Sequence, residues 1–531
     1  MQAESPSVYE RLQTLLPAPK PIEPTGWLNR ARALEGPWAR GLRSVSQVIF
    51  INHPLSGALL LLAFWLSSPW MAGWALVGMT AANGVSHWMR LSPELRNQGI
   101  HGFNGVLVGC ATAALANTPM PSAANAAQLT LLVAIGGGLT TWMIELWRLR
   151  FHRRGDPPVL TLPFCLITWV LLAVVPPSLT TPLEAIQPAA ATTPLETLLL
   201  GIPHSFGQVF LCSSLTSGCL VAIAVVIASP MAAGLGVIGA IIGMTSSLIQ
   251  GADASAVAQG LWGYNSVLTA IALGGIFHTP SSRSILLAML GASLATLLQV
   301  LQIRMIGILP PLTLSFVITT WCLQGLAKRR LPALIPVCLH AVVSPEEHRH
   351  RYGVTRVLLE RFRRHLQERL AGIPTISAPP VLEEPLNRQT QELFAELDRD
   401  QDGRLSFAEL RHALMSNLIQ RKAENNDPLL DDQLNTVLAA MDLNQDGQIN
   451  RMEFGHFIQH LRRLRDGEDR LRLYLIPMDA NGDDQLEPNE LDRLLRSLGQ
   501  TNLTSAETNL VYADHPEGLS WRQWIDQLLL A

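Results

Sequence analysis

The sequence predicts an all-α protein: a polytopic membrane protein of two inverted five-helix repeats with re-entrant pore helices, followed by a soluble helical domain. Three observations lead to this fold class. Long stretches of the first 328 residues carry no charged side chain, and three short sequence blocks occur twice in the same order. After Lys328 the chain becomes charged and polar. We therefore divide it into a segment 1–44, a membrane domain 45–328, a connector 329–385 and a C-terminal domain 386–531.

The charge-free stretches define the membrane domain. No Asp, Glu, Lys or Arg lies between Arg43 and Arg90, between Arg96 and Glu145, or between Glu196 and Asp253. About 20 apolar residues cross the hydrocarbon core of a bilayer, so each stretch is long enough for two crossings. The segment before residue 45 contains prolines and arginines rather than a continuous apolar core, and we expect no removable signal peptide.

The duplicated blocks divide the membrane domain into repeats near 45–178 and 206–328. The blocks are, in the first and second copies, SQVIF (46–50) and GQVFL (207–211), HGFNGVLVG (101–109) and WGYNSVLTA (262–270), and VLTLPF (159–164) and PLTLSF (311–316). The offset is 161 residues for the first two blocks (207 − 46, 262 − 101) and 152 for the third (311 − 159). Three blocks in one order indicate an internal duplication.

Each repeat is expected to contain five crossings and one short re-entrant segment. In the first repeat the crossings lie near 47–66, 69–88, 103–118, 125–147 and 159–177, with the short segment near 91–101. In the second they lie near 208–228, 231–249, 264–278, 283–303 and 311–327, with the short segment near 252–262. Because five is odd, the second repeat enters the membrane upside down, which places a solute site between the repeats.

The charges of the loops support this topology. If the arginine-rich N-terminal segment lies inside, the basic segments 148–156 and 328–330 also fall inside, as the positive-inside rule requires. The connection 176–203 falls outside and contains no Lys or Arg. We expect a multi-pass protein of the cell membrane, the inner membrane in a bacterium, with both termini and the C-terminal domain in the cytoplasm.

The repeated blocks also indicate the kind of solute. A single glycine-rich block is explained equally well by helix packing, but two Gly-x-Asn-x-x-Leu blocks at a fixed offset favour a function. The expected path carries Gln47, Gln208, Thr161 and Thr313, whereas an ion or proton relay needs Asp, Glu, Lys or His. This pattern predicts a neutral polar solute and argues against an ion pump.

The paired blocks resemble those of the urea transporter family, of bacterial type, over roughly residues 40–328. The resemblance implies a homotrimer in which each protomer conducts urea passively through its own narrow pore. It implies solute contacts by Gln47, Val48, Phe50, Phe103, Leu107, Thr161, Gln208, Val209, Leu211, Tyr264, Leu268 and Thr313. It also implies rows of backbone carbonyls at residues 100–102 and 261–263 that accept hydrogen bonds from the four N–H groups of urea.

Three positions depart from the family pattern. Gln208 stands where relatives often carry Glu, Tyr264 where we expect Phe, and Ser315 where the first repeat has Pro163. The tyrosine hydroxyl is able to change solute preference. A channel for a related small neutral solute, such as a short amide or ammonia, therefore stays open beside urea.

The C-terminal domain carries EF-hand motifs, in which oxygen ligands at positions 1, 3, 5, 7, 9 and 12 of a loop bind Ca²⁺. In the first two loops the expected ligands are Asp398, Asp400, Asp402, Arg404 (by its carbonyl), Ser406 and Glu409, then Asp442, Asn444, Asp446, Gln448, Asn450 and Glu453. A third loop offers Asp479, Asn481, Asp483, Gln485 and Glu490, but has Asp484 where the turn favours glycine. Leu405 and Ile449 fall at the position through which the first two loops pair. Residues 514–524 read as a shortened fourth hand that serves only as a structural partner.

The connector contains a basic amphipathic helix. Leu358, Leu359, Phe362, Leu366 and Leu370 form one stripe among arginines. A membrane-surface strap, an ordinary packed helix and a target helix for the calcium-loaded hands all fit this pattern. We hypothesise that residues 355–371 dock on the EF-hands.

The sequence leads to two alternative functions, a channel and an enzyme. The first is a passive urea channel that responds to Ca²⁺, with urea, the lipid bilayer and further copies of the chain as partners and no nucleic acid. The alternative is an EF-hand-controlled integral membrane enzyme. That alternative requires clustered catalytic residues, and the apolar half contains neither paired haem-type histidines nor a nucleophile with a base, so we expect no enzyme.

Overall fold

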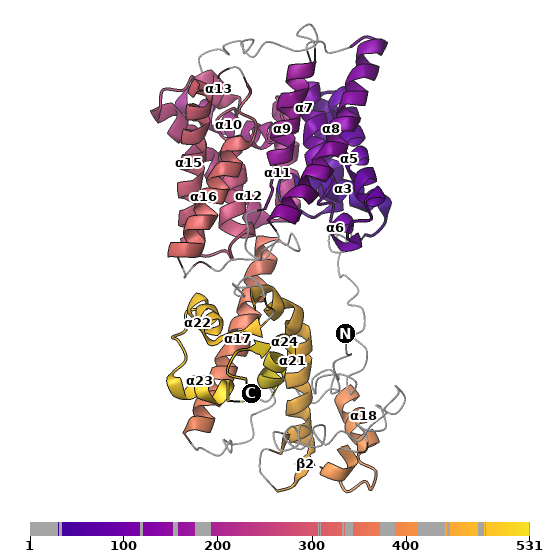
Figure 1. Cartoon of the computed structure of the whole chain (residues 1–531), viewed down its shortest axis with the longest axis vertical. Helices are drawn as coiled ribbons and strands as arrows, with labels where there is room; N and C mark the ends of the chain where they lie inside the picture. Colours follow the sequence, from indigo (N-terminus) through magenta and orange to yellow (C-terminus); the bar gives the residue numbers. More distant parts are fainter. Residues whose placement is uncertain are drawn as a thin grey trace. The chain divides into compact units, whose positions relative to one another are not determined.

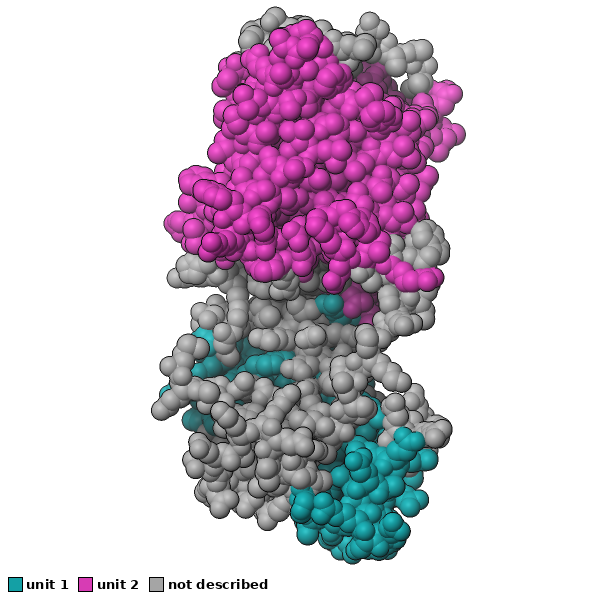
Figure 2. Space-filling view, turned by 90° about the vertical axis from the view of Figure 1, so that its right-hand side faces the viewer, with its two compact units in different colours: residues 1–23, 351–531 teal, residues 24–350 magenta. Residues whose placement is uncertain are grey.

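The computed structural model describes most of the chain and is mostly helical, as predicted. The described residues are 30, 34–116, 121–151, 158–175, 193–305, 307, 309–331, 334, 344–371, 388–410, 412, 441–442, 446–475, 483, 485–513 and 515–529. The chain divides into two compact units, residues 1–23 with 351–531 (unit 1) and residues 24–350 (unit 2), which Figure 2 distinguishes by colour.

Unit 2 contains two series of helices that follow the same order. The first is α3 (Pro37–Gln47), α4 (Pro54–Ser67), α5 (Pro69–Trp88), α6 (Pro93–Asn97), α7 (Phe103–Leu115), α8 (Ala123–Arg150) and α9 (Leu162–Val174). The second is α10 (Pro194–Gln208), α11 (Leu215–Ala228), α12 (Pro230–Ile249), α13 (Ala254–Ala258), α14 (Tyr264–Ile271) with the π-helix η3 (Ala272–Ile276), α15 (Ser282–Met305) and α16 (Leu314–Arg330). In Figure 1, α3, α5, α7 and α8 gather in the indigo-to-purple group, whereas α10, α12, α15 and α16 gather in the magenta-to-salmon group.

The predicted first crossing of each repeat begins too early. Helix α3 ends at Gln47, the chain turns through Phe50 in a left-handed conformation (φ 62°), and α4 begins only at Pro54. The second series repeats this break, because α10 ends at Gln208 and Leu211 is left-handed (φ 60°). The prediction was wrong because the apolar residues of the turn make the hydropathy continuous across it. Helices α3 and α10 were therefore missed.

Hydrogen bonds between the two series are reciprocal. Ser56 Oγ donates to the Ala224 carbonyl at 2.8 Å, and Ser217 Oγ donates to the Ala63 carbonyl at 2.8 Å. The residues of the two bonds are equivalent, because Ser217 and Ala224 lie 161 residues after Ser56 and Ala63 (217 − 56, 224 − 63). The indole N–H groups of Trp169 and Trp321 make a second reciprocal pair, with the carbonyls of Pro310 and Pro158 at 3.0 and 2.8 Å. Such exchange of partners is the pattern that an approximate two-fold relation between the two halves would produce.

Glycines allow the helices of each half to approach closely. On α5, a methyl group at Gly78 would overlap the Gly105 carbonyl of α7, and one at Gly137 of α8 would overlap the Gly78 backbone. The three helices therefore meet backbone to backbone, as small residues permit inside membranes.

Among the described helices, three are long and apolar enough to cross a membrane: Ala123–Arg150, Pro230–Ile249 and Ser282–Met305. Five more described helices are apolar but shorter, including α4 and α11.

The described part of unit 1 contains long and short helices and two small antiparallel sheets. Its elements are the greater part of α17 (Pro345–Leu370), then α18 (Arg388–Leu397), β1 (Arg404–Ser406), β2 (Gln448–Asn450), α21 (Arg451–Leu475), β3 (Gln485–Leu486), α22 (Pro488–Ser497), α23 (Ser505–Val511), β4 (Leu519–Ser520) and α24 (Trp521–Leu529). β1 pairs with β2 so that Leu405 faces Ile449, and β3 pairs with β4 so that Leu486 faces Leu519. Helix–loop–helix motifs thus occur in pairs.

The close approach at Gly78 gives a stability prediction with a control on the same helix. Gly78→Ala should lower stability by about 1–3 kcal/mol or more, because the backbone has no room to relax. Gly84→Ala, where a methyl group meets nothing within 4 Å, should leave stability unchanged or slightly raised. Thermal unfolding of detergent-solubilised protein, followed by tryptophan fluorescence, measures both. Equal melting temperatures for the two variants would contradict the close packing.

Candidate functional site

The two halves of unit 2 meet at a pair of threonine hydroxyls. Thr161 Oγ1 and Thr313 Oγ1 lie 2.7 Å apart, and both residues are almost fully buried. Each threonine is the residue before a helix, α9 or α16, and neither hydroxyl caps its own helix. The preceding residues Leu160 and Leu312 are left-handed (φ 53° and 45°), which turns each threonine towards its counterpart. The predicted residues Thr161 and Thr313 are thus brought together.

An asparagine holds each of these turns. Asn104 Nδ2 donates to the Leu160 carbonyl at 3.1 Å, and Asn265 Nδ2 donates to the Leu312 carbonyl at 3.1 Å. The Asn104 amide oxygen also accepts from the Phe164 backbone N–H at 3.2 Å. The Gly-x-Asn and Leu-Thr-Leu blocks recur together because each asparagine anchors its own threonine turn.

Tyr264 adds a second donor in one half only. Its hydroxyl donates to the Leu312 carbonyl at 2.6 Å, beside the amide of Asn265, and the residue is buried. Phe103, its counterpart, has no hydroxyl. The Tyr264 hydroxyl is therefore bound by the protein backbone, where it supports the turn that carries Thr313.

The two predicted glutamines occupy equivalent places at the ends of α3 and α10. Gln47 Nε2 donates to the Gln98 carbonyl at 3.0 Å, and Gln208 Nε2 donates to the Gln259 carbonyl at 3.2 Å. Each donor is a side-chain amide whose oxygen is a further hydrogen-bond acceptor. Gln98 and Gln259, just beyond α6 and α13, did not stand out in the sequence because they contribute only backbone carbonyls here.

Four of the six carbonyls in the predicted rows already accept a hydrogen bond from the protein. The His101 carbonyl shares the Thr141 hydroxyl, at 3.3 Å, with the nearer Ala82 carbonyl at 2.9 Å, and the Leu261 carbonyl accepts from Gln299 Nε2 at 2.7 Å. The Gly102 and Gly263 carbonyls accept backbone N–H groups of α7 and α14. A carbonyl oxygen has two lone pairs, so each retains one acceptor position.

Buried groups of different chemistry support the segments before α7 and α14. In the first half, His101 Nε2 lies 3.2 Å from Glu145 Oε1, and Glu145 Oε2 lies 2.8 Å from Arg148 Nε. In the second half, the amide of Gln299 bridges Leu261 and Asn265. Glu145 was not predicted from the sequence, where it stands only at the end of a charge-free stretch.

The apolar residues of the predicted site surround this polar centre. Val48, Leu107, Val209 and Leu268 are fully buried, and Phe50, Phe103 and Leu211 are half-buried against the same core. Phe50 makes edge-to-face contacts with Phe277 and Phe316, with ring centroids 6.0 and 5.9 Å apart. Phe277 and Phe316, which belong to the other half, were not predicted from the sequence.

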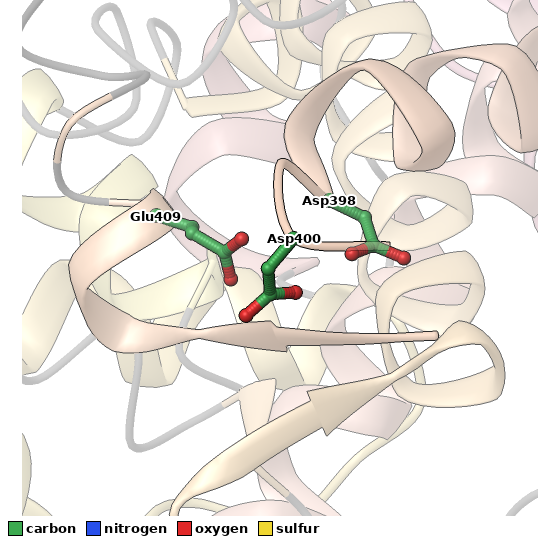
Figure 3. A group of neighbouring side chains, drawn as sticks. All are labelled: Asp398, Asp400 and Glu409. Atoms are coloured by element: carbon green, nitrogen blue, oxygen red, sulfur yellow. The ribbon is translucent and has the colours of Figure 1, made fainter. Parts of the chain in front are cut away.

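The first EF-hand loop brings its predicted ligands together (Figure 3). One oxygen each of Asp398, Asp400 and Glu409 lie within 4.8 Å of one another. Asp398 Oδ1 is buried without a hydrogen-bond partner, and Gly403 is left-handed (φ 83°), as the sharp turn requires. The Ser406 backbone N–H and hydroxyl hold the pKa of Glu409 below its ordinary value. These carboxylate oxygens and the orphaned acceptor fit a Ca²⁺ ion.

The second loop has the same geometry in its described part. Asp442 Oδ2 accepts from the Gly447 N–H at 2.8 Å, and Gly447 is left-handed (φ 77°). Glu453 is buried and accepts from the Asn450 N–H at 2.9 Å. Asn444 lies outside the described residues. The predicted pairing of Leu405 with Ile449 is confirmed.

Of the third loop, Asp479 and Asn481 lie outside the described residues. In the described part, Asp483 Oδ1 accepts from the Gln485 N–H at 2.8 Å, and Glu490 Oε2 accepts from the Glu487 N–H at 3.2 Å. These are the same local bonds that the first loop makes at Asp402 and Glu409.

The fourth loop is not shortened, contrary to the prediction. Leu486 is residue eight of the third loop and pairs with Leu519, so the fourth loop runs over twelve residues, 512–523. Gln523 takes the last position, and its amide oxygen accepts from the Ser520 N–H at 2.8 Å, as Glu409 does from Ser406. The loop begins at Tyr512, two residues before the expected start. With Tyr512 and Gln523 at its ends, the loop has no carboxylate at positions 1 and 12, where an EF-hand loop binds Ca²⁺ through acidic residues.

Within unit 1, helix α17 packs on the third and fourth hands. Phe362 makes an edge-to-face contact with Trp524 (centroids 4.9 Å apart). Arg363 donates to the Thr501 and Asn502 carbonyls at 2.5 and 3.0 Å, and lies 3.5 Å from the Glu507 carboxylate. Of the predicted stripe, Leu358, Leu359, Phe362 and Leu366 are buried, whereas Leu370 is exposed. The hypothesis of docking on EF-hands therefore applies to the second pair.

These features define a class: a helical membrane transport protein with duplicated halves, joined to paired EF-hands. A family model described as urea transporter matches residues 39–328, and one described as an EF-hand domain pair matches residues 388–459. The chain belongs to the urea transporter family. This membership replaces the alternative of a membrane enzyme, because the family consists of channels.

Known proteins resemble the two parts separately. Urea transporter 1 of Mus musculus is 28% identical over 332 residues, which cover 58% of this chain and 81% of the relative. Urea transporter 1 of Ovis aries is 27% identical over the same extent. A mitochondrial adenyl nucleotide antiporter, SLC25A24 of Bos taurus, is 29% identical over 161 residues, which cover 30% of each chain.

The Tyr264 hydroxyl gives a prediction for solute passage. Tyr264→Phe removes one of two donors on the Leu312 carbonyl, a loss of about 0.5–1.5 kcal/mol. Because that turn positions Thr313, urea flux should change roughly two- to tenfold while the protein still folds. Flux per protomer in proteoliposomes measures this. If the hydroxyl contacts solute directly, Tyr264→Phe will instead change the ratio of urea to acetamide flux.

The first EF-hand gives a calcium-binding prediction. Glu409→Gln should weaken its site at least about tenfold, because the terminal carboxylate supplies two ligand oxygens. Glu396→Gln, at an exposed position of α18, is the matched control and should bind as the wild type does. Isothermal titration with Ca²⁺ counts the sites in each variant. Unchanged stoichiometry and affinity in Glu409→Gln would rule out this loop as a site.

Proposed function

We propose that this protein is a passive channel for urea whose flux is modulated by Ca²⁺ binding to the EF-hands. The observation that carries the proposal is the hydroxyl pair Thr161–Thr313, formed where two equivalent halves meet. Gln47 and Gln208 stand in equivalent positions of the two halves. A path built in this way presents the same sequence of polar groups from either side.

The chemistry of these groups suits urea. Urea is planar, with four N–H donors and one carbonyl, so glutamine oxygens, backbone carbonyls and threonine hydroxyls replace the water that it loses. Buried valine, leucine and phenylalanine side chains beside them give hydrated ions no compensation for lost water. The path is thereby selective for a small neutral solute.

Within the proposal, flow is passive. Glu145 is paired with His101 and Arg148 at the end of α8, and the groups at the meeting point of the halves are uncharged. A relay for coupled ions needs ionisable groups along the path itself. The Tyr264 hydroxyl is engaged by a backbone carbonyl, which favours urea over a solute that requires an extra hydroxyl contact.

The proposed topology has ten crossings in two inverted repeats, with both termini and the EF-hands in the cytoplasm. The approximate two-fold relation of the halves supports it, since inverted repeats are related by such an axis in the membrane plane. Basic segments at 148–150 and 328–330 agree with the positive-inside rule. The twelve predicted contact residues remain assigned to the solute path.

We further propose a homotrimer in the bilayer. Large apolar side chains on α8 and α15 are exposed in the single chain: Leu131, Leu139, Trp142, Leu146, Leu286, Leu290 and Leu297. Helices that expose such rows require lipid or another protein surface. The proposed trimer covers part of this surface with other copies of the chain and leaves the rest to lipid.

Flux into proteoliposomes tests the function. Full-length protein should admit urea faster than empty vesicles do, and Gln208→Met should lower that flux about tenfold by removing an acceptor from the path. Gln128→Met, at an exposed position of α8, should not change it. Flux in micromolar Ca²⁺ and in chelator tests the calcium part. Urea entry no faster than in empty vesicles would contradict the channel, and equal flux in both conditions would contradict modulation.

A further inference from the structure

The first turn of α17 is docked on unit 2, to which residues 345–350 belong. Glu346 Oε2 accepts from Ser229 Oγ at 2.7 Å, and Glu346 Oε1 accepts from the Met231 backbone N–H at 2.7 Å. Ser229 and Met231 flank the first residue of α12. One carboxylate thus bridges a side chain and a backbone N–H at the start of that helix.

The start of α12 is an electrostatically favourable position for a carboxylate. The first N–H groups of a helix have no partner within the helix and carry partial positive charge. Here Ser229 caps the Ala232 N–H at 3.0 Å, and Glu346 takes the Met231 N–H. In the other half, α5 is preceded by Ser68, whose side chain makes no cap bond. The carboxylate therefore breaks the two-fold relation at this point.

The neighbouring residue, Pro345, packs against the helix that carries two of the pore residues. Helix α14 begins at Tyr264, carries Leu268 and continues as the π-helix η3. A methyl group on Gly275 of η3 would lie 2.6 Å from Pro345 Cγ, so only glycine leaves room for the proline ring.

The amino-acid sequences of the two halves differ around Gly275, the residue that faces Pro345. Gly274 and Gly275 correspond at the 161-residue offset to Ala113 and Ala114. In that half, α7 continues as a regular α-helix to Leu115, whereas its counterpart changes to a π-helix after Ile271. Single π-turns inside α-helices occur frequently at functional sites. The irregular turn and the paired glycines coincide with the docking of Pro345.

From residue 351 on, helix α17 belongs to unit 1. Its residues Phe362 and Arg363 bind the second EF-hand pair through Trp524, Thr501, Asn502 and Glu507. The contacts of Pro345 and Glu346 thus lie within unit 2, and those of Phe362 and Arg363 lie within unit 1.

We propose that the surface formed by the start of α12 and by η3 is the docking surface through which the EF-hand domain acts on the pore, with Pro345 and Glu346 of the same chain as its occupant. This inference deepens the proposed function and rests on it. A change in α17 on Ca²⁺ binding alters the hold of Glu346 and Pro345 on α12 and η3. The π-turn then transmits the change to Tyr264 and Leu268.

The test compares calcium-dependent flux among variants of the full-length chain. Glu346→Ala removes the carboxylate, and Gly275→Ala displaces the proline ring without touching Glu346. In both, urea flux should become the same with and without Ca²⁺, although titration still finds the wild-type calcium sites. Glu360→Gln, at an exposed pair with Arg356 on the same helix, should keep the wild-type response. A wild-type calcium response in either Glu346→Ala or Gly275→Ala would overturn the inference.

Hydrogen exchange of the wild-type protein tests it without any variant. Residues 264–277 should change their exchange rate several-fold when Ca²⁺ is added to the reconstituted protein. Unchanged exchange there, in protein whose flux responds to Ca²⁺, would overturn the docking surface and leave the proposed function standing. Absence of urea flux in the wild type would instead contradict the proposed function itself.

Discussion

The polar centre of unit 2 depends on one contact, the hydrogen bond between Thr161 and Thr313. Each threonine reaches it because a left-handed leucine turns the chain and an asparagine from the adjoining repeat block holds that leucine's carbonyl. Because the same geometry is built twice, the two hydroxyls meet where the halves join. The reciprocal bonds of serine and tryptophan between the halves keep that junction in register. A narrow polar centre inside apolar helices is the result.

The two halves share this arrangement, but they differ at several residues around it. Tyr264 adds a hydroxyl to one threonine turn, and a neutral amide at Gln299 supports the segment that Glu145 and His101 support in the other half. In the second half, Glu346 caps α12, and glycines stand at 274 and 275 where the first half has alanines. In the proposed mechanism, urea passes along the polar groups that both halves share, and Ca²⁺ acts through the residues that only the second half has.

Repetition made much of this predictable from the sequence. The offsets of 161 and 152 identified Thr161 with Thr313 and Gln47 with Gln208, and loop spacing identified Leu405 with Ile449. The hydrogen-bond partners of Gln47 and Gln208 could not be predicted from the sequence, because they are backbone carbonyls whose positions are set by the fold. It also missed the breaks after α3 and α10, where apolar residues continue through a turn. Glu346 and the register of the fourth EF-hand became clear only from long-range contacts.

A double-mutant cycle in proteoliposomes tests the central claim, that the two halves form one urea path at this hydroxyl pair. Thr161→Val and Thr313→Val each keep side-chain shape and remove one hydroxyl. The account predicts that each lowers urea flux and that the double variant loses clearly less than the product of the two single effects, because the hydroxyls act as a pair. Independent, multiplicative effects would show that they do not act together. Unchanged flux in all three variants would place the path elsewhere.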